Sequence, residues 1–122
     1  MSESTELIRE FCSAWSRLDP AELAQYFTED GVYHNMPTGP VKGRAEIEQF
    51  IRAFAGSWTA TEWEIISLAE GEGVVIAERL DRTTAGDKSV DLPCTGIFEI
   101  RDGKIAVWRD YFDLGTYVRA MQ

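Results

Sequence analysis

The sequence predicts an α+β fold in which helices cover one face of a curved β-sheet. Amphipathic helical patterns occupy the first half of the 122 residues, and four strand-like segments joined by short turns fill the second half. Hydrophobic residues make up 44% of the chain, which is enough material for a core. No linker or internal repeat interrupts the pattern, so we expect a single domain over residues 1–122.

Helices are expected from apolar spacing and from capping residues. Near the N-terminus, apolar residues recur at helical spacing at Leu7, Ile8, Phe11, Trp15 and Leu18. In DPAEL, Asp19 can cap a second helix, which is expected to run from residue 20 to about residue 26 or 27 and to stop at the EDG of residues 29–31. A third helix is expected over residues 45–54, with a buried stripe of Ile47, Phe50, Ile51 and Phe54.

Strands are expected where the apolar pattern alternates. The stretch VYHNM predicts a short strand over residues 32–36, before the Pro/Gly-rich turn PTGPVKG. Four longer strands are expected over residues 61–70, 73–84, 89–100 and 104–113. The turns GEG, AGD and RDGK between them suit hairpins, and residues 114–122 are expected to form a short helix or tail. Such a sheet can curl into a cone whose mouth binds a ligand.

Composition excludes several classes of function. A net charge of −9 argues against nucleic acid and against an anionic membrane surface. No apolar run approaches the ~18 residues of a membrane span, and the acidic N-terminus lacks the features of a signal peptide, so we expect a soluble cytoplasmic protein. Cys12 and Cys94 show no metal spacing and are expected to be reduced, buried thiols. His34 is the only histidine, which argues against a Ser-His-Asp triad or a metal site.

Polar side chains alternate with apolar ones where packing alone would not place them. Side chains two residues apart on a strand share a face, and three such faces carry polar groups. These groups are Tyr33 with Asn35, Arg79 with Asp81 (continuing the face of Val75 and Ala77), and Asp110 between Trp108 and Phe112. If the three faces point into the concave side of the sheet, five polar groups converge in an apolar cavity.

Two carboxylates and one arginine form a workable buried group. One guanidinium can hold both acids, and neighbouring carboxyls push their pKa values apart, leaving one ionised and one protonated near neutral pH. That pair is suited to general acid–base chemistry. Alternation does not say which face is inside, however, and Arg–Asp pairs on strands are commonly structural or solvated.

Three motifs together resemble a known family. Tyr33-x-Asn35-Met36-Pro37, Arg79-x-Asp81 and Trp108-Arg109-Asp110-Tyr111-Phe112-Asp113 are similar, in order and spacing, to the signature of limonene-1,2-epoxide hydrolases. These enzymes have the NTF2-like (SnoaL-like) fold. The resemblance implies a strongly curved mixed sheet, helices packed in its concavity, and a dimer.

The resemblance also implies a role for each matched residue. Asp110 would be the base that deprotonates a water held by Tyr33 and Asn35. Asp81 would be the acid that protonates the epoxide oxygen, and Arg79 would bridge the two aspartates. The implied reaction converts a cyclic or terpenoid epoxide, like limonene-1,2-epoxide, and water to a vicinal diol in one step, without a cofactor or a metal.

The walls of the pocket and the outer face of the sheet are also predicted. Trp108 and Phe112 flank the base, and the resemblance places Leu92, Cys94 and Met36 against the substrate, although each could equally be ordinary core. The opposite face of the last strand carries Arg109, Tyr111 and Asp113, with Ile105 and Val107. Its partly apolar character favours a homodimer formed through the sheets.

Two other functions share this fold. A ketosteroid-isomerase-like or polyketide-cyclase-like enzyme would use one aspartate beside a carbonyl and would not need the bridged pair. A non-catalytic binding or dimerisation module would need no ionisable cluster. Fold alone does not choose among the three.

Overall fold

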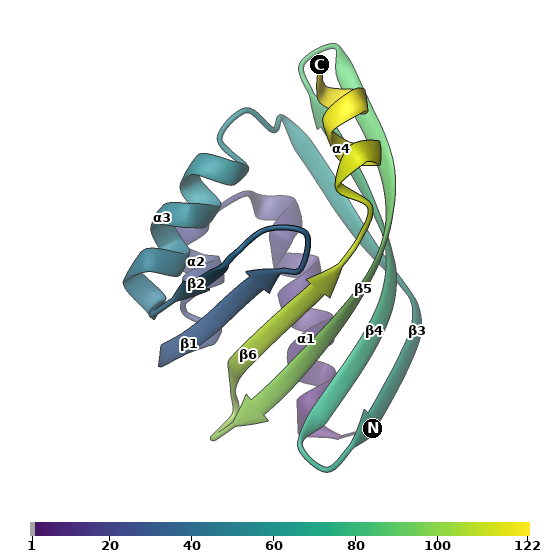
Figure 1. Ribbon diagram of the computed structural model, residues 1–122. Coiled ribbons are helices and arrows are strands. Elements are labelled where there is room, and N and C mark those ends of the chain that lie inside the picture. The colour runs from purple at the N-terminus through teal and green to yellow at the C-terminus, as the bar shows by residue number, and fades with distance from the viewer. Residues whose placement is uncertain (1) are drawn as a thin grey trace.

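A computed structural model describes residues 2–122 (Figure 1). Its helices and strands follow the predicted order, except that a short strand over residues 40–42 pairs with the preceding strand inside PTGPVKG, where only a turn was predicted. The elements are α1 (Glu3–Ala14), the 3₁₀ turn η1 (Trp15–Arg17), α2 (Pro20–Ala24), β1 (Phe27–Asn35), β2 (Pro40–Lys42), α3 (Arg44–Phe54), β3 (Ala60–Gly71), β4 (Val74–Ala85), β5 (Lys88–Arg101), β6 (Lys104–Tyr111) and α4 (Leu114–Met121). Within residues 2–122, no helix is both long and apolar enough to cross a membrane.

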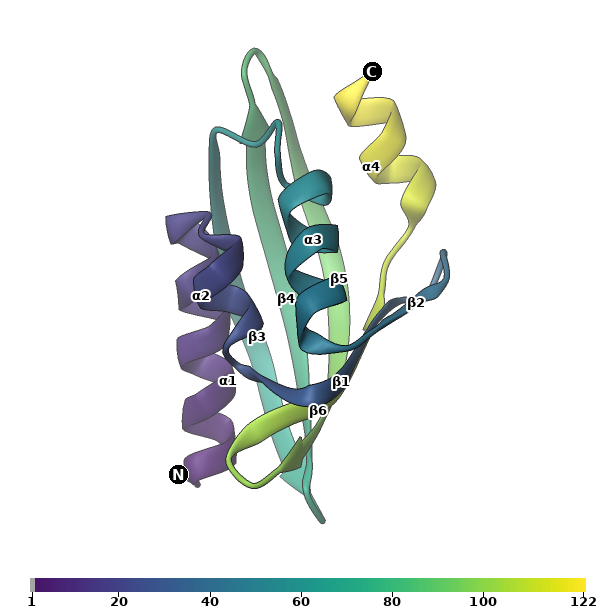
Figure 2. The same cartoon turned by 90° about the vertical axis from the view of Figure 1, so that its left-hand side faces the viewer.

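The six strands form one curved mixed sheet in the order β2-β1-β6-β5-β4-β3. Strand β1 runs parallel to β6, and every other neighbouring pair is antiparallel. Helices α1, α2 and α3 lie against the concave face of the sheet (Figures 1 and 2). Helix α4 lies beside the N-terminal half of β5. The predicted α+β fold, with a curved sheet and helices in its concavity, is confirmed.

An aromatic core joins the helices to the sheet. The Phe11 ring of α1 makes edge-on contacts with four aromatic rings: Trp15, Phe27, Phe98 and Trp108. Trp108 in turn stacks on Tyr33 and on Phe98, with ring centroids 4.2 and 5.3 Å apart. Because every one of these rings is buried, β6 is fixed tightly at the centre of the molecule.

The boundary between α2 and β1 differs from the prediction. The second helix ends at Ala24, and the EDG of residues 29–31 lies inside β1 rather than ending a helix. Phe27 is drawn into the strand because its ring is fully buried, and the register of β1 on β6 shifts between Phe27 and Val32. The shift lies where Glu29 and Asp30 are exposed to solvent. Packing of Phe27 in the core therefore outweighs the local sequence preference for a helix.

The face occupied by Ile105 also differs from the prediction. Ile105 is fully buried in the core rather than exposed on the outer face with Val107 and Tyr111. The β5–β6 register shifts, since Val107 pairs with Glu99 whereas Ile105 pairs with Ile100. The extra residue in β6 inverts the alternation on one side of this bulge, which reasoning from strict period two cannot anticipate.

Candidate active site

The five polar side chains singled out in the sequence converge on the concave face of the sheet. They come from β1, β4 and β6 and are 0–4% exposed: Tyr33, Asn35, Arg79, Asp81 and Asp110. The strand register brings them together, because Asn35 pairs with Asp110 across β1 and β6, while Arg79 and Asp81 follow each other along β4. The condition that the sequence left open is therefore met, because all five side chains are buried on the inner side of the sheet.

Arg79 donates four hydrogen bonds to the two carboxylates. Its Nε and Nη2 donate to Asp81 Oδ1 and Oδ2 at 3.0 and 2.8 Å. Its Nη1 and Nη2 donate to Asp110 Oδ1 and Oδ2 at 2.8 and 2.9 Å. Each carboxylate accepts two hydrogen bonds from the planar guanidinium, so the positions of Asp81 and Asp110 relative to each other are fixed although they come from separate strands.

Two tryptophan rings pack against the Arg79 guanidinium, and a glycine leaves room for it. The guanidinium carbon lies 4.5 Å from the Trp63 ring centroid and 5.7 Å from that of Trp108. Gly96 of β5 leaves room beneath it, since a Cβ there would lie 2.7 Å from Arg79 Nη1 and 2.9 Å from Trp108 Nε1. These neighbours favour a single position for the charged group.

The aromatic residues around Asp110 hold its carboxylate in place. Trp108 Nε1 donates to Asp110 Oδ1 at 3.3 Å, and the indole itself is clamped between Tyr33 and Phe98. A buried carboxylate is costly unless it is paired, and Arg79 supplies the pairing. The aspartate therefore lies among aromatics in a rigid, dry setting.

Burial and charge give the groups of the site different proton affinities. Burial raises the pKa of Asp81 more than Arg79 lowers it. Burial lowers the pKa of Arg79, but Asp110 and Asp81 together hold it well above its usual value, so Arg79 stays charged. Burial and then the Asp110 charge raise the pKa of the Tyr33 hydroxyl, which stays neutral and can donate.

A small cavity, partly open to solvent, lies over the cluster, and the centre of a water-sized sphere has about 20 Å³ of room in it. Of the predicted residues, those that line it are Tyr33, Asn35, Asp81, Leu92, Cys94, Asp110 and Phe112. Arg79 and Trp108 lie outside the lining and are fully buried. Met36 also lies outside the lining, and its backbone N–H donates to the Asp110 carbonyl at 2.9 Å.

Several lining residues were not selected from the sequence as site residues. They are Phe54, Trp58, Trp63, Thr83, Val90 and Tyr117. Phe54, Trp58 and Tyr117 come from α3, the segment after it, and α4, whose positions depend on tertiary packing. Thr83 could have been selected, because it continues the inward face of Arg79 and Asp81 by two residues.

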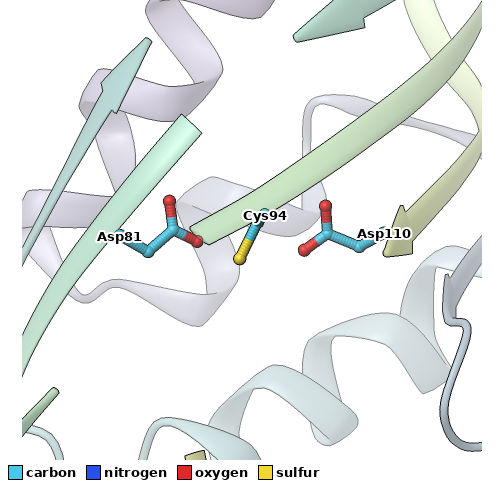
Figure 3. A group of neighbouring side chains, drawn as sticks. All are labelled: Asp81, Cys94 and Asp110. Carbon is cyan, nitrogen blue, oxygen red and sulfur yellow. The ribbon is translucent and has the colours of Figure 1, made fainter. Parts of the chain in front are cut away.

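Cys94 lies on β5 between the two carboxyls (Figure 3). Ligand atoms of Asp81, Cys94 and Asp110 lie within 4.8 Å of one another, as metal ligands would. Arg79 already donates to both carboxylates, however, and burial raises the pKa of the Cys94 thiol well above its usual value. A neutral thiol beside a fixed positive charge is a poor donor set for a cation.

Fold and site together define a class of protein: an NTF2-like domain whose cavity holds an arginine-bridged pair of carboxyls. An NTF2-like protein of unknown function from Burkholderia pseudomallei shares the fold, with a TM-score of 0.88 and 20% identity over 100% of this chain and 99% of its own. The family model of the limonene-1,2-epoxide hydrolase catalytic domain matches residues 2–122. The chain belongs to this family.

A curated sequence and a solved structure, both from Mycobacterium tuberculosis, are similar to the chain. The epoxide hydrolase EphG is 31% identical over 86 residues, which are 70% of this chain and 57% of that protein. The chain thus spans a little over half the length of this curated relative. A solved LEH-like epoxide hydrolase is 26% identical with a TM-score of 0.83, covering 97% of this chain and 88% of the other.

Proposed function

We propose that the protein is a cofactor-independent epoxide hydrolase that adds water to a cyclic or terpenoid epoxide and releases a vicinal diol. The observation that carries this proposal is the bidentate pairing of one buried arginine with two carboxyls, Asp81 and Asp110, in the floor of an apolar cavity. Membership of the epoxide hydrolase family supports it.

Asp110 is the base in this proposal. Tyr33 and Asn35 line the cavity beside it and can hold a water by a hydroxyl and an amide. As the water oxygen bonds to an epoxide carbon, one water proton passes to the Asp110 carboxylate. Water is a weak nucleophile, and a positioned base contributes about 10²–10⁴-fold to the rate.

Asp81 is the acid. The breaking C–O bond leaves its electron pair on the ring oxygen, and the proton of Asp81 neutralises that oxygen as the ring opens. Burial raises the pKa of Asp81, which favours the protonated form that this role requires. The reaction leaves Asp110 protonated and Asp81 ionised, and transfer of one proton between them restores the starting state.

The first test is diol formation from limonene, cyclohexene and styrene oxides by wild type and by Asp110→Asn. We expect turnover by the wild type alone, with an unchanged far-UV spectrum in the variant. Activity retained by the folded variant would contradict the role of Asp110. If neither protein forms a diol, the isomerase-like and binding functions gain support.

Isotope labelling tests the direct attack of water. A single turnover in oxygen-18 water should place the label in the diol and leave the protein unlabelled. Label found on an aspartate would instead indicate a covalent ester intermediate.

We also infer that the protein forms a homodimer through the outer face of the sheet. Large apolar side chains project from that face: Ile66, Ile76 and Tyr111 are 57%, 42% and 43% exposed. They come from three strands, β3, β4 and β6. Sedimentation equilibrium should give twice the 13.8 kDa chain mass, and a monomer would reject this inference.

A further inference from the structure

Two hydroxyl groups line the cavity away from the acid–base cluster. Thr83 is 4% exposed and follows Asp81 by two residues on β4. Tyr117 projects from α4 and packs against Val90, Leu92 and Cys94. Both residues line the cavity, and the proposed hydrolysis uses neither of them.

An indole bonds to Thr61, the hydrogen-bond partner of Thr83. Trp63 Nε1 donates to Thr61 Oγ1 at 3.0 Å, so Thr61 acts as the acceptor in that contact. Thr61 Oγ1 lies 2.7 Å from Thr83 Oγ1, where either hydroxyl could donate, and 3.3 Å from the Arg82 carbonyl, to which Thr61 can donate. Over residues 2–122 the Thr83 hydroxyl has no partner but Thr61, so in either arrangement it keeps an unused donor or acceptor position.

A second indole bonds directly to Tyr117. Trp58 Nε1 donates to Tyr117 Oη at 2.9 Å, and an indole nitrogen cannot accept. The phenol hydrogen therefore has no role in this contact and finds no other partner in the part of the chain that the structure describes. Both hydroxyls thus keep hydrogen-bonding capacity at an otherwise aromatic and aliphatic wall.

The position of these hydroxyls sets where a bound molecule would need a polar group. Asp81 pairs with Leu92 across β4 and β5, and Thr83 pairs with Val90. Two residues along a strand correspond to about 7 Å. A ligand oxygen near Thr83 would therefore lie about 7 Å from an epoxide oxygen at Asp81.

We propose that Thr83 and Tyr117 form a polar subsite, and that the substrate is an epoxide carrying a second oxygen function, a carbonyl or a hydroxyl, about 7 Å from the ring oxygen. A hydrocarbon epoxide would leave the spare hydrogen-bonding positions of both hydroxyls unused, whereas a ligand oxygen there could pair with them. The identification of the substrate as an epoxide rests on the proposed function, whereas the subsite itself does not.

The test compares two ligands of the same shape. Acetyl and isopropenyl groups differ by C=O against C=CH₂, so the 4-acetyl and 4-isopropenyl cyclohexane-1,2-diols form a matched pair in which the diol occupies the acid–base end. Binding is followed by tryptophan fluorescence, because Trp58 and Trp63 line the cavity. We expect Thr83→Val to reduce the preference for the ketone, taken as the ratio of the two Kd values, by about 3- to 10-fold.

Further variants separate the hydroxyl from effects on folding. Thr83→Ser should keep the preference, and Tyr117→Phe should lower it. Thr84→Val is the matched control, because it removes a hydroxyl from the neighbouring residue, which lies outside the cavity lining. A ratio unchanged in both Thr83→Val and Tyr117→Phe would overturn the subsite.

The two corresponding epoxides distinguish this inference from the proposed function. A preference for the ketone that depends on Thr83, with no hydrolysis of either epoxide, would support the subsite and contradict the hydrolase. Hydrolysis of both epoxides, with a kcat/KM ratio that Thr83→Val and Tyr117→Phe leave unchanged, would support the hydrolase and overturn the subsite.

Discussion

Gly96 is the residue whose substitution most directly tests how the acid–base cluster is built. In Gly96→Ala the added methyl would lie 2.7 Å from Arg79 Nη1 and 2.9 Å from both Trp108 Nε1 and Phe98 Cε1. None of these side chains can move away from the added methyl group without losing a contact. Arg79 Nη1 is held at 2.8 Å from Asp110, and Trp108 stacks on Tyr33 and Phe98.

The expected effect on stability has two parts. Overpacking in a filled core costs about 1–3 kcal/mol. Weakening the buried pairing of Arg79 with Asp110 adds part of the roughly 3–5 kcal/mol that a broken buried ion pair costs. We therefore expect Gly96→Ala to lower the free energy of unfolding by about 3 kcal/mol and Tm by about 10 °C.

Activity should fall more steeply than stability. A displacement of about 1 Å in a catalytic group can cost about 10²-fold in rate, and the methyl must move Arg79 or the strand that carries it. We expect kcat/KM for epoxide opening to fall by about two orders of magnitude under conditions where the variant is folded.

Urea denaturation followed by tryptophan fluorescence measures the stability of the variant. Gly39→Ala is the matched control, because a Cβ there has no neighbour within 4 Å. If Gly96→Ala unfolds at the wild-type urea concentration and keeps wild-type kcat/KM, then Arg79 does not need this clearance, and the account of how the cluster is positioned is refuted.

Three further predictions concern protons, thiols and the C-terminal helix. In the proposed mechanism Asp81 donates a proton, and its pKa is raised, so kcat/KM should fall as pH rises through that pKa. A profile flat into alkali would contradict the acid role. The same raised pKa stabilises the fold below the usual aspartate value, and this contribution is lost as pH rises through the raised one. Burial raises the pKa of Cys12 to about 12 and that of Cys94 further, so iodoacetamide at pH 8 should label both thiols in urea and neither in the native protein, as mass spectrometry would show. Asp113→Ala removes the acceptor for Thr116 N and Oγ1 at the start of α4, so hydrogen exchange in α4 should quicken while exchange in β4 is unchanged; equal protection in both proteins would contradict the cap.

Alternation along regular strands predicted which polar side chains share a face, but not that this face lies inside the sheet. Arg79, Asp81 and Asp110 lie where β4 and β6 pair with β5 without interruption, so counting by two places them on one face. Ile105 lies beyond a one-residue irregularity in β6, and the same counting fails there. Register is a property of two paired strands, so the sequence of one strand does not contain it.

The cavity wall could be predicted only in part. Leu92 and Cys94 lie on β5, between the two strands that carry the acids, and Phe112 directly follows β6; all three line the cavity. Trp58 and Tyr117 lie 59 residues apart and meet only because α4 folds back over β5. The role of Gly96 was missed for a related reason. A glycine is required there because Arg79, Phe98 and Trp108 lie where a Cβ would be, and only the folded structure shows this.

The place of β5 in the sheet has a consequence for how this scaffold can diversify. Asp81 and Asp110, the acid and the base of the proposed mechanism, lie on β4 and β6, the two strands that flank β5. The backbones that carry them are therefore two strand spacings apart, about 9.6 Å. Hydrogen bonding of the sheet sets that gap, whereas α3, α4 and the segment around Trp58 supply much of the wall. The wall of the cavity can therefore change by exchange of side chains on the helices, while the spacing of Asp81 and Asp110 stays constant.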